Sequence, residues 1–387
     1  MASAAGPAAT VRCALAPPAG AYTAAVGANG DVALAVPNGT GAAVVTILGD
    51  QSTVVADSWD SPPTGIAFAP DGDHVVFVKR TGEIDLDRVG VPGPERMLVP
   101  SGPRGSLTVL GGWSGLKTLV YERSSFENGE RHSAIYAVDT STSTSREITA
   151  GHDPSVSPDG AKIAFVSGGG LAWGDELDTI GVDGAGRRTI LVKSPITSPV
   201  WSSDSTQLAF LWTIDENPHL DVVQADGAGA HEIGVAHAPL FWTPAGIVTH
   251  VFRVDAGPAG VVVDPASGSV RPLGHVTARG GVVPVAVGYG LVAYIVLRGD
   301  GDRLGGVRLV NSDGTNDHAL EQCHGTARAD RIYGSPLADE IVAGSGNDVV
   351  YVRGGGVDFV ACGPGRDVVY ADKRDHVYRD CERVMRR

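Results

Sequence analysis

Short apolar runs joined by tight turns recur along most of the chain. The clearest copies run from Ile66 to Val78, from Pro154 to Val166 and from Val200 to Leu211. In the first two copies, proline presets φ at the first turn position, aspartate hydrogen-bonds its own backbone, and glycine takes the positive φ that follows. Each copy is therefore predicted to be a β-hairpin of two apolar strands.

The hairpin turn returns at a nearly constant spacing. Successive turns are 42, 43, 45, 45, 41 and 44 residues apart, at Asn29-Gly30, Asp71-Gly72, Ser114-Gly115, Asp159-Gly160, Asp204-Ser205, Ala245-Gly246 and Tyr289-Gly290. A third apolar run, a second turn and a short fourth run follow each hairpin, with clear second turns at Val182–Gly186 and Ala225–Gly229. Four short strands in a repeat of this length are typical of a propeller blade.

We therefore predict an all-β chain whose main domain, residues 21–322, is a seven-bladed β-propeller behind a lead-in at residues 1–20. One blade cannot cover both of its faces, so neighbouring blades stack radially around a channel. No stretch keeps an apolar period of 3.6 residues, which excludes helical solenoids.

The turns Ser157-Pro158-Asp159-Gly160 and Ala69-Pro70-Asp71-Gly72 resemble the blade turn of TolB-like bacterial propellers. The resemblance spans roughly Tyr22 to Leu320 and implies blade architecture without a specific function. Relatives of this kind often have six blades, so a six-bladed ring is the alternative to seven. The Trp-Asp signature of eukaryotic-type WD propellers is absent.

A shorter period replaces the blade repeat from Gly325 onward. Its units end on aspartates 9, 9, 10 and 9 residues apart, each followed within two positions by an apolar residue: Asp330, Asp339, Asp348, Asp358 and Asp367. The best units place paired glycines before the aspartate, at Gly344 and Gly346, Gly354 and Gly356, and Gly363 and Gly365.

These units resemble the RTX (haemolysin-type) calcium repeat, Gly-Gly-x-Gly-x-Asp-x-apolar-x. The resemblance implies a parallel β-roll over residues 323–387 that binds Ca²⁺ through the aspartates and glycines just named. Ca²⁺ takes oxygen ligands, and clustered carboxylates repel one another without a cation, so we expect the tail to order on binding metal. The alternative is a Gly/Asp-rich loop without metal, because the first two units have one glycine each.

The charge excludes two classes of partner. The net charge is −14, and residues 323–387 hold 10 acidic and 10 basic residues, so the excess lies in the first 322. An acidic body disfavours nucleic acid and anionic membrane surfaces.

The uncharged stretch Gly280–Leu297 contains Pro284 and is predicted to form two strands rather than a membrane span. The small, Ala-rich first ten residues lack signal-peptide features, so we expect the sequence to begin near the mature N-terminus.

Four cysteines allow three pairings: Cys13, Cys323, Cys362 and Cys381. Because a closed ring brings its two ends together, a Cys13–Cys323 disulfide would hold the ring closed. A Cys362–Cys381 disulfide would then fix the end of the C-terminal roll to the final segment of the chain. Free buried thiols are the alternative. An even count favours an oxidising compartment, and we expect an extracellular or periplasmic protein.

No catalytic motif stands out. Gly112-Trp113-Ser114-Gly115-Leu116 breaks the nucleophile-elbow pattern, and His231-Glu232 lacks the second histidine of a zinc protease. Histidines near predicted blade edges are expected to be structural, and the aromatics Trp201, Trp212, Trp242 and Phe241 are expected in the core.

The sequence therefore favours a secreted, non-enzymatic binding propeller with calcium-stabilised repeats. A monomer is expected, and the partner is an unknown protein, glycan or cell-wall component held by loops on one face of the ring. The alternative is an extracellular lyase or hydrolase with its site in the propeller funnel. Convergence of two or three histidines or carboxylates on one pocket would favour that enzyme.

Overall fold

A computed structural model describes residues 9–12, 23–27, 31–38, 41–48, 51–59, 63–89, 95–103, 105–127, 130–168, 174–214, 217–253, 257–273, 282–288, 290–297, 304–315, 317–319, 323–334, 339–354 and 358–387. Strands, turns and bends make up this described part of the chain, which contains no helix. It accordingly holds no helical segment long and apolar enough to cross a membrane.

Seven four-stranded antiparallel sheets follow one another in chain order, each pairing its strands in sequence. The first three sheets are β2 (Thr23–Val26), β3 (Val32–Asn38), β4 (Gly41–Leu48) and β5 (Gln51–Trp59); β6 (Gly65–Phe68), β7 (His74–Val78), β8 (Ile84–Arg88) and β9 (Arg96–Val99); β10 (Leu107–Ser114), β11 (Thr118–Glu127), β12 (Glu130–Asp139) and β13 (Thr144–Ala150).

The other four sheets are β14 (His152–Val156), β15 (Lys162–Gly168), β16 (Asp175–Gly181) and β17 (Arg188–Lys193); β18 (Ile196–Trp201), β19 (Gln207–Ile214), β20 (Asn217–Gln224) and β21 (His231–Val235); β22 (His237–Thr243), β23 (Gly246–Arg253), β24 (Gly257–Val263) and β25 (Val270–Pro272); β26 (Val282–Gly288), β27 (Leu291–Leu297), β28 (Leu304–Asn311) and β29 (His318–Ala319).

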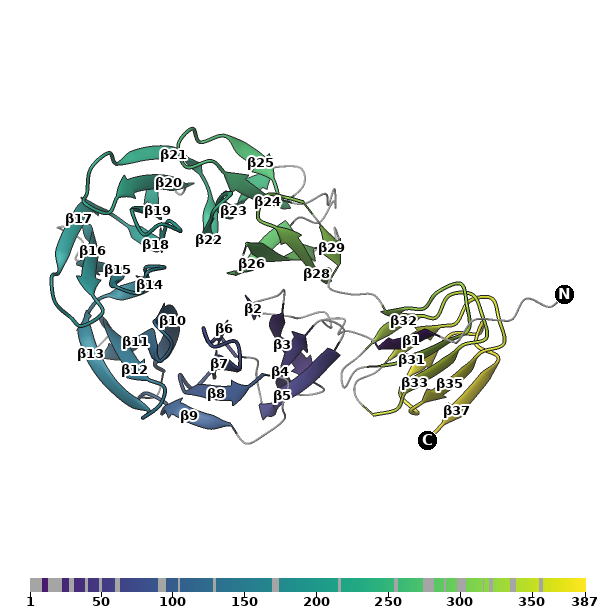
Figure 1. Cartoon of the computed structure of the whole chain (residues 1–387). Helices are drawn as coiled ribbons and strands as arrows, with labels where there is room; N and C mark the ends of the chain where they lie inside the picture. The colour runs from purple at the N-terminus through teal and green to yellow at the C-terminus, as the bar shows by residue number, and fades with distance from the viewer. Residues whose placement is uncertain are drawn as a thin grey trace.

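The sheets stand around a central axis (Figure 1), and the expected all-β propeller is confirmed. The first strand of each sheet is innermost and contacts the first strand of the next, from β2 through β6, β10, β14, β18 and β22 to β26. The ring closes because β26 contacts β2 in turn. The predicted strand pair at Gly280–Leu297 is confirmed as β26 and β27.

The predicted hairpin turns have the expected chemistry. Gly72 and Gly160 adopt φ of 73° and 72°. The Asp71 Oδ1 accepts the backbone N–H of Asp73 at 2.9 Å, and the Gly160 N–H donates to the Ser157 carbonyl at 2.7 Å. Asn29-Gly30, predicted as the first turn, lies outside the described residues.

Aliphatic layers between neighbouring sheets form the propeller core. The second strand of a blade is buried on both faces, as at Val75–Val78, where every side chain is fully buried. Such a strand reads as a continuous apolar run rather than an alternating one. This burial explains why the repeat is visible in the sequence as continuous apolar runs and not as alternating apolar and polar residues.

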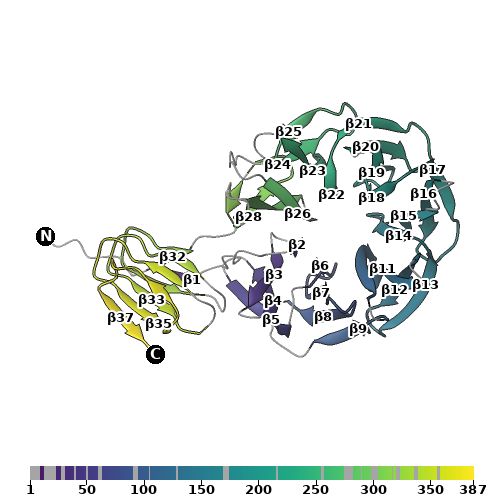
Figure 2. The same ribbon diagram turned by 180° about the vertical axis from the view of Figure 1, so that it is seen from behind.

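The C-terminal region is a two-sheet parallel roll beside the seam between the first and last propeller sheets (Figures 1 and 2). One sheet holds β1 (Ala9–Arg12), β31 (Asp330–Tyr333), β33 (Val349–Val352), β35 (Val368–Ala371) and β37 (Arg383–Arg386). The other holds β30 (Cys323–His324), β32 (Glu340–Val342), β34 (Phe359–Ala361) and β36 (His376–Val377). The N-terminal strand β1 pairs in parallel with β31, so both ends of the chain meet in the roll.

A small apolar core fills the roll. Ile332, Val350 and Val369 face Ile341 and Val360 across the two sheets and are almost completely buried. Outside, Tyr333, Tyr351 and Tyr370 stack at centroid distances of 4.7 and 5.0 Å.

A disulfide closes the end of the roll. The predicted Cys362–Cys381 bond is confirmed, with Cα atoms 5.1 Å apart. Cys323 is also disulfide-bonded. Its predicted partner, Cys13, lies outside the described residues.

Candidate binding and metal sites

The strand order gives the ring two unlike faces. One face, here called the turn face, carries the links from first to second and from third to fourth strands, which are mostly tight turns such as Ser157–Gly160 and Val182–Gly186. The opposite loop face carries the links from second to third strands and from each sheet to the next. The segments 79–83, 100–103 and 105–106 belong to the loop face.

A cavity of about 1170 Å³, here called the channel cavity, runs from the loop face into the channel. The inner strands β2, β6, β10 and β26 line it, together with Phe241 of β22. Leu107 and Val109 of β10 are 53% and 45% exposed there. Exposed apolar side chains gathered in one cavity are typical of a binding surface.

A second cavity, of about 880 Å³, lies on the loop face between the third and fourth sheets. We call it the rim cavity. Its lining is polar and includes Arg123, His132, His152, Asp175 and Arg187.

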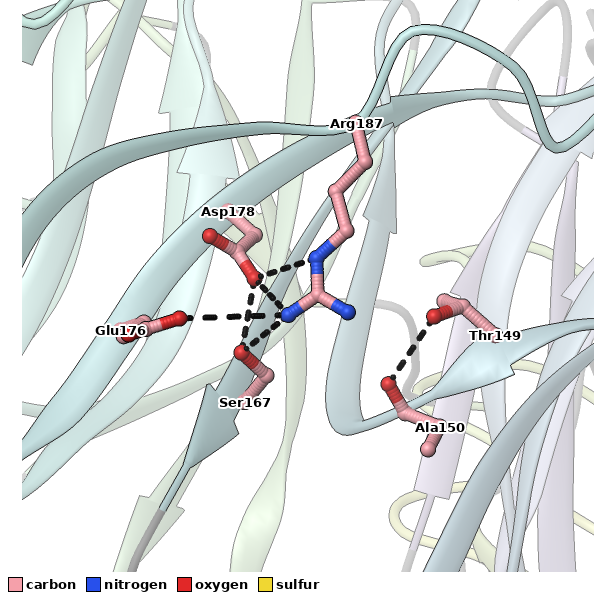
Figure 3. Close-up of polar contacts among 6 residues, drawn as sticks. All are labelled: Thr149, Ala150, Ser167, Glu176, Asp178 and Arg187. Atoms are coloured by element: carbon pink, nitrogen blue, oxygen red, sulfur yellow. Dashed lines mark hydrogen bonds and ion pairs between the residues drawn. The ribbon is translucent and has the colours of Figure 1, made fainter.

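Arg187 is held in place beside the rim cavity (Figure 3). Its Nε donates to the Asp178 carboxylate at 3.0 Å, and its Nη2 donates to the Ser167 hydroxyl at 2.8 Å. Glu176 lies 3.9 Å from Nη2, and the guanidinium sits 5.3 Å from the centre of the Phe165 ring. Because Asp178 is fully buried, this pair holds strands β15 and β16 and the segment before β17 together.

Similar buried aspartates recur in other sheets. Asp85 pairs with Lys79, Asp221 with Lys193, and Asp317 with Arg308. In three sheets the aspartate lies directly across from a phenylalanine of the second strand: Phe77 and Asp85, Phe165 and Asp178, Phe210 and Asp221. These pairs were not predicted from the sequence, although an aspartate at the same place in three repeats was a usable signal. Their regular placement marks them as structural.

The described histidines are spread over several sheets, and two of them, His132 and His152, line the rim cavity. His237 and His250 stack at 5.5 Å, while His219 is 3.0 Å from Glu232 and His152 is 3.8 Å from Asp153. Within the described residues, no group of three or more His, Cys, Asp or Glu side chains is placed to hold a metal ion. His275 lies outside that part of the chain.

The four tryptophan and phenylalanine positions singled out in the sequence divide between core and cavity. Trp201 is 4% exposed and donates its indole N–H to the Ser155 carbonyl at 2.9 Å. Trp242 packs against the core of the fifth and sixth sheets. The Lys193 ammonium lies over the Trp212 ring, 3.6 Å from the ring centroid. Phe241 lines the channel cavity.

The tail aspartates form two ladders inside the roll. In the first, the backbone N–H of Asp330 donates to Asp348 and that of Asp348 to Asp367, both at 2.8 Å. In the second, the N–H of Asp339 donates to Asp358 at 2.8 Å. All five aspartates are at most 2% exposed.

Two further acids complete the ladders. Asp375 accepts the N–H of Asp358 at 3.3 Å, and Glu382 accepts that of Asp367 at 2.7 Å. The sequence analysis stopped at Asp367 because the glycines end there. The pattern acid-x-apolar, continued in Asp375-His376-Val377 and Glu382-Arg383-Val384, would have found both.

Three carboxylates of the ladders have an unpaired oxygen. The second carboxylate oxygens of Asp348, Asp358 and Asp367 are buried and have no hydrogen-bond partner among the described residues. Burial is the main cause that raises the pKa of Asp358 to about 8; the nearby carboxylates also raise it, and the hydrogen bond from Asp339 opposes the shift. Unpartnered buried carboxylate oxygens are donors that fit a hard cation such as Ca²⁺.

The tail glycines have a packing role whether or not a metal binds. A Cβ on Gly344 or Gly346 would lie 2.3 or 2.4 Å from a carbonyl oxygen of the preceding coil, and one on Gly363 or Gly365 would lie 2.1 or 1.6 Å from such an oxygen. Gly354 adopts a φ of 82° with open space around it. Gly356 lies outside the described residues.

Comparisons with known proteins bear on the fold. No family model matches the chain, and no curated protein matches its sequence. Similar solved structures include TolB from Acinetobacter baumannii, with 16% identity, TM-score 0.47 and coverage of 62% of each chain. The chain thus spans under two thirds of that TolB.

Two enzymes have similar folds. An oligogalacturonate lyase from Vibrio parahaemolyticus has 13% identity and TM-score 0.58, with 76% of this chain and 90% of the lyase covered. A puromycin-hydrolyzing peptidase from Mycobacterium tuberculosis has 16% identity and TM-score 0.56, with 85% of this chain and 66% of the peptidase covered. At these identities the likeness is one of fold alone.

Proposed function

We propose that the chain is a non-enzymatic binding propeller whose partner is held at the loop face. The observation that carries this proposal is the opening of both large cavities on that face, with exposed Leu107 and Val109 in one of them. Ligand sites prefer such concave, largely apolar surfaces with a few polar groups. We further infer that each of the seven sheets is one blade, because every inner strand contacts two neighbouring inner strands.

The lyase or hydrolase alternative needs catalytic side chains that converge on one pocket. His132, His152 and Asp175 line the rim cavity together, whereas His237 and His250 stack on each other and His219 contacts Glu232. A binding role requires no such convergence.

A matched pair of substitutions tests the loop-face assignment. We expect Leu107→Asp to abolish capture of the partner from native extracellular medium, because it places a charge on the apolar cavity wall. Leu116→Asp changes an equally apolar residue, 65% exposed, on the turn face of the same sheet and should leave capture intact. Equal capture by both variants would place the binding surface elsewhere.

A calcium site in the tail is proposed as a second function, carried by the unpartnered carboxylate oxygens of Asp348, Asp358 and Asp367. Each ladder would hold its own ion, through Asp348 and Asp367 in the first and Asp358 in the second, together with backbone carbonyl oxygens of the glycine turns. When bound, Ca²⁺ would neutralise the ladders and so stabilise the roll. The disulfides, together with a calcium requirement, favour an extracellular or periplasmic location.

Thermal unfolding tests the calcium proposal. Ca²⁺ at about 100 times its dissociation constant should stabilise the roll by about 2.7 kcal/mol over a chelator control. Asp358→Asn should weaken this response, while Asp313→Asn, in an exposed propeller turn, should not. Identical unfolding curves with calcium and with chelator would refute the site.

A further inference from the structure

The rim cavity gathers two arginines and two histidines in a chain whose net charge is negative. The net charge is −14, yet Arg123, His132, His152 and Arg187 all line this one cavity. Asp175 is the only carboxylate among the lining residues, and its Oδ2 already accepts the backbone N–H at the start of β18 at 2.8 Å. The cavity therefore favours an anionic ligand.

Several polar atoms in this cavity lack a partner. The Ser106 hydroxyl, the Ser133 hydroxyl and the Arg123 Nε are buried and make no hydrogen bond with the described residues. Ser106 as a whole is only 5% exposed. Buried polar groups are normally paired, so three such groups lining one cavity indicate a hydrogen-bonding occupant.

The guanidinium groups of Arg123 and Arg187 are held in position by hydrogen bonds, and each still has an N–H donor available to a ligand. The Arg123 Nη2 donates to the carbonyls of Gly82 and Pro100 at 3.0 and 2.8 Å, which leaves its Nε free. The Arg187 bonds drawn in Figure 3 use Nε and Nη2. Its Nη1 carries no bond in that view and lies on the side of Ala150, which lines the cavity. Prearranged guanidinium groups suit carboxylate recognition.

Hydroxyl groups determine which kind of anion fits best. Ser106, Ser125 and Ser133 line the cavity with Tyr136, whose ring stacks on Tyr121 at 5.3 Å. A saccharide hydroxyl both donates and accepts, so it satisfies a serine and an arginine N–H at once, whereas a carboxylate only accepts. The backbone amides of an acidic peptide also donate and accept, so hexaglutamate serves as the competing ligand in the titration.

We propose that the rim cavity binds an acidic saccharide. Its carboxylate lies against Arg123 and Arg187, and its hydroxyls bond to Ser106 and Ser133. The cavity, at about 880 Å³, is within the size range of small-ligand sites. The inference rests on the proposed binding function of the loop face and names a ligand class for it.

Calorimetric titration of the full chain in calcium buffer tests this proposal. The probe is β-1,4-linked triglucuronate, and the matched control is cellotriose, which has a hydroxymethyl group in place of each carboxylate. We expect triglucuronate to bind at least tenfold more tightly. Equal binding of the two, no binding of triglucuronate, or equal competition by inorganic phosphate or hexaglutamate would overturn the assignment.

Two variants localise the binding. Ser106→Ala should leave the unfolding temperature unchanged, since the hydroxyl has no hydrogen-bond partner among the described residues, but weaken triglucuronate binding about fivefold. Arg123→Gln should weaken it about tenfold or more. Arg188→Gln is the control, because its Nη2 donates to the Asp226 carbonyl on the turn face at 2.6 Å. Unchanged affinity in both Ser106→Ala and Arg123→Gln would overturn the site.

The two levels of the proposal can fail separately. If triglucuronate does not bind but partner capture still depends on Leu107, the ligand assignment is wrong and the loop-face function stands. If triglucuronate binds as predicted and Leu107→Asp still captures the partner, the rim cavity is confirmed and the channel wall is not the partner surface.

Discussion

A buried histidine pair makes the sixth sheet sensitive to acid. His250 is 7% exposed, its Nδ1 has no hydrogen-bond partner among the described residues, and its ring packs against His237 and Phe252. Burial, together with the neighbouring His237, lowers the pKa of His250. The unfolded chain therefore takes up this proton at a higher pH, near 6.5, so stability falls as the pH drops below that value.

Denaturant unfolding between pH 7.5 and 5 measures this effect at the residue scale. The wild type should lose up to about 1.4 kcal/mol per pH unit for this proton. His250→Phe should flatten the profile, while His231→Gln, at an exposed position, should keep it. A profile that does not change in His250→Phe would contradict the assignment.

At the scale of elements, stacked coils explain the tail glycines. A Cβ on Gly365 would lie 1.6 Å from the Gly346 carbonyl oxygen, whereas one on Gly354 meets nothing within 4 Å. Gly365→Ala should therefore force the coils apart and destabilise the roll by about 1–3 kcal/mol, measured by thermal unfolding. Gly354→Ala should cost only about 1–2 kcal/mol, from its positive φ. A larger loss in Gly354→Ala would argue against coil stacking.

The elements that the sequence predicts are those with local signals. Turn residues such as Asp71-Gly72 and Asp159-Gly160 specify hairpins by their own dihedral preferences, so the propeller blades could be predicted. The Cys362–Cys381 bond was predicted as the pair that remains once ring closure joins Cys13 to Cys323. Contacts between distant residues depend on strand register and sheet packing, which a short sequence motif does not specify. Examples are the ion pair of Asp178 with Arg187 and the shared cavity of Ser106, Arg123 and Ser133.

At the scale of the whole molecule, the ring depends on one seam. A Cβ on Gly288 of β26 would lie 2.4 Å from the Val26 carbonyl oxygen of β2, where the last sheet meets the first. Gly288→Ala should open this seam, lower stability by about 1–3 kcal/mol and speed proteolysis of the first sheet. Gly65→Ala is the control, since its nearest atom is a Val78 side-chain methyl at 3.3 Å. Equal protease resistance of both variants would contradict ring closure through this contact.

Hydrogen exchange of the full chain, with and without its captured partner, tests the central claim most directly. Binding at the loop face should slow exchange in segments 79–83 and 100–110 and leave the turns at 70–72 and 157–160 unchanged. Protection confined to those turns, or to the roll, would contradict the account.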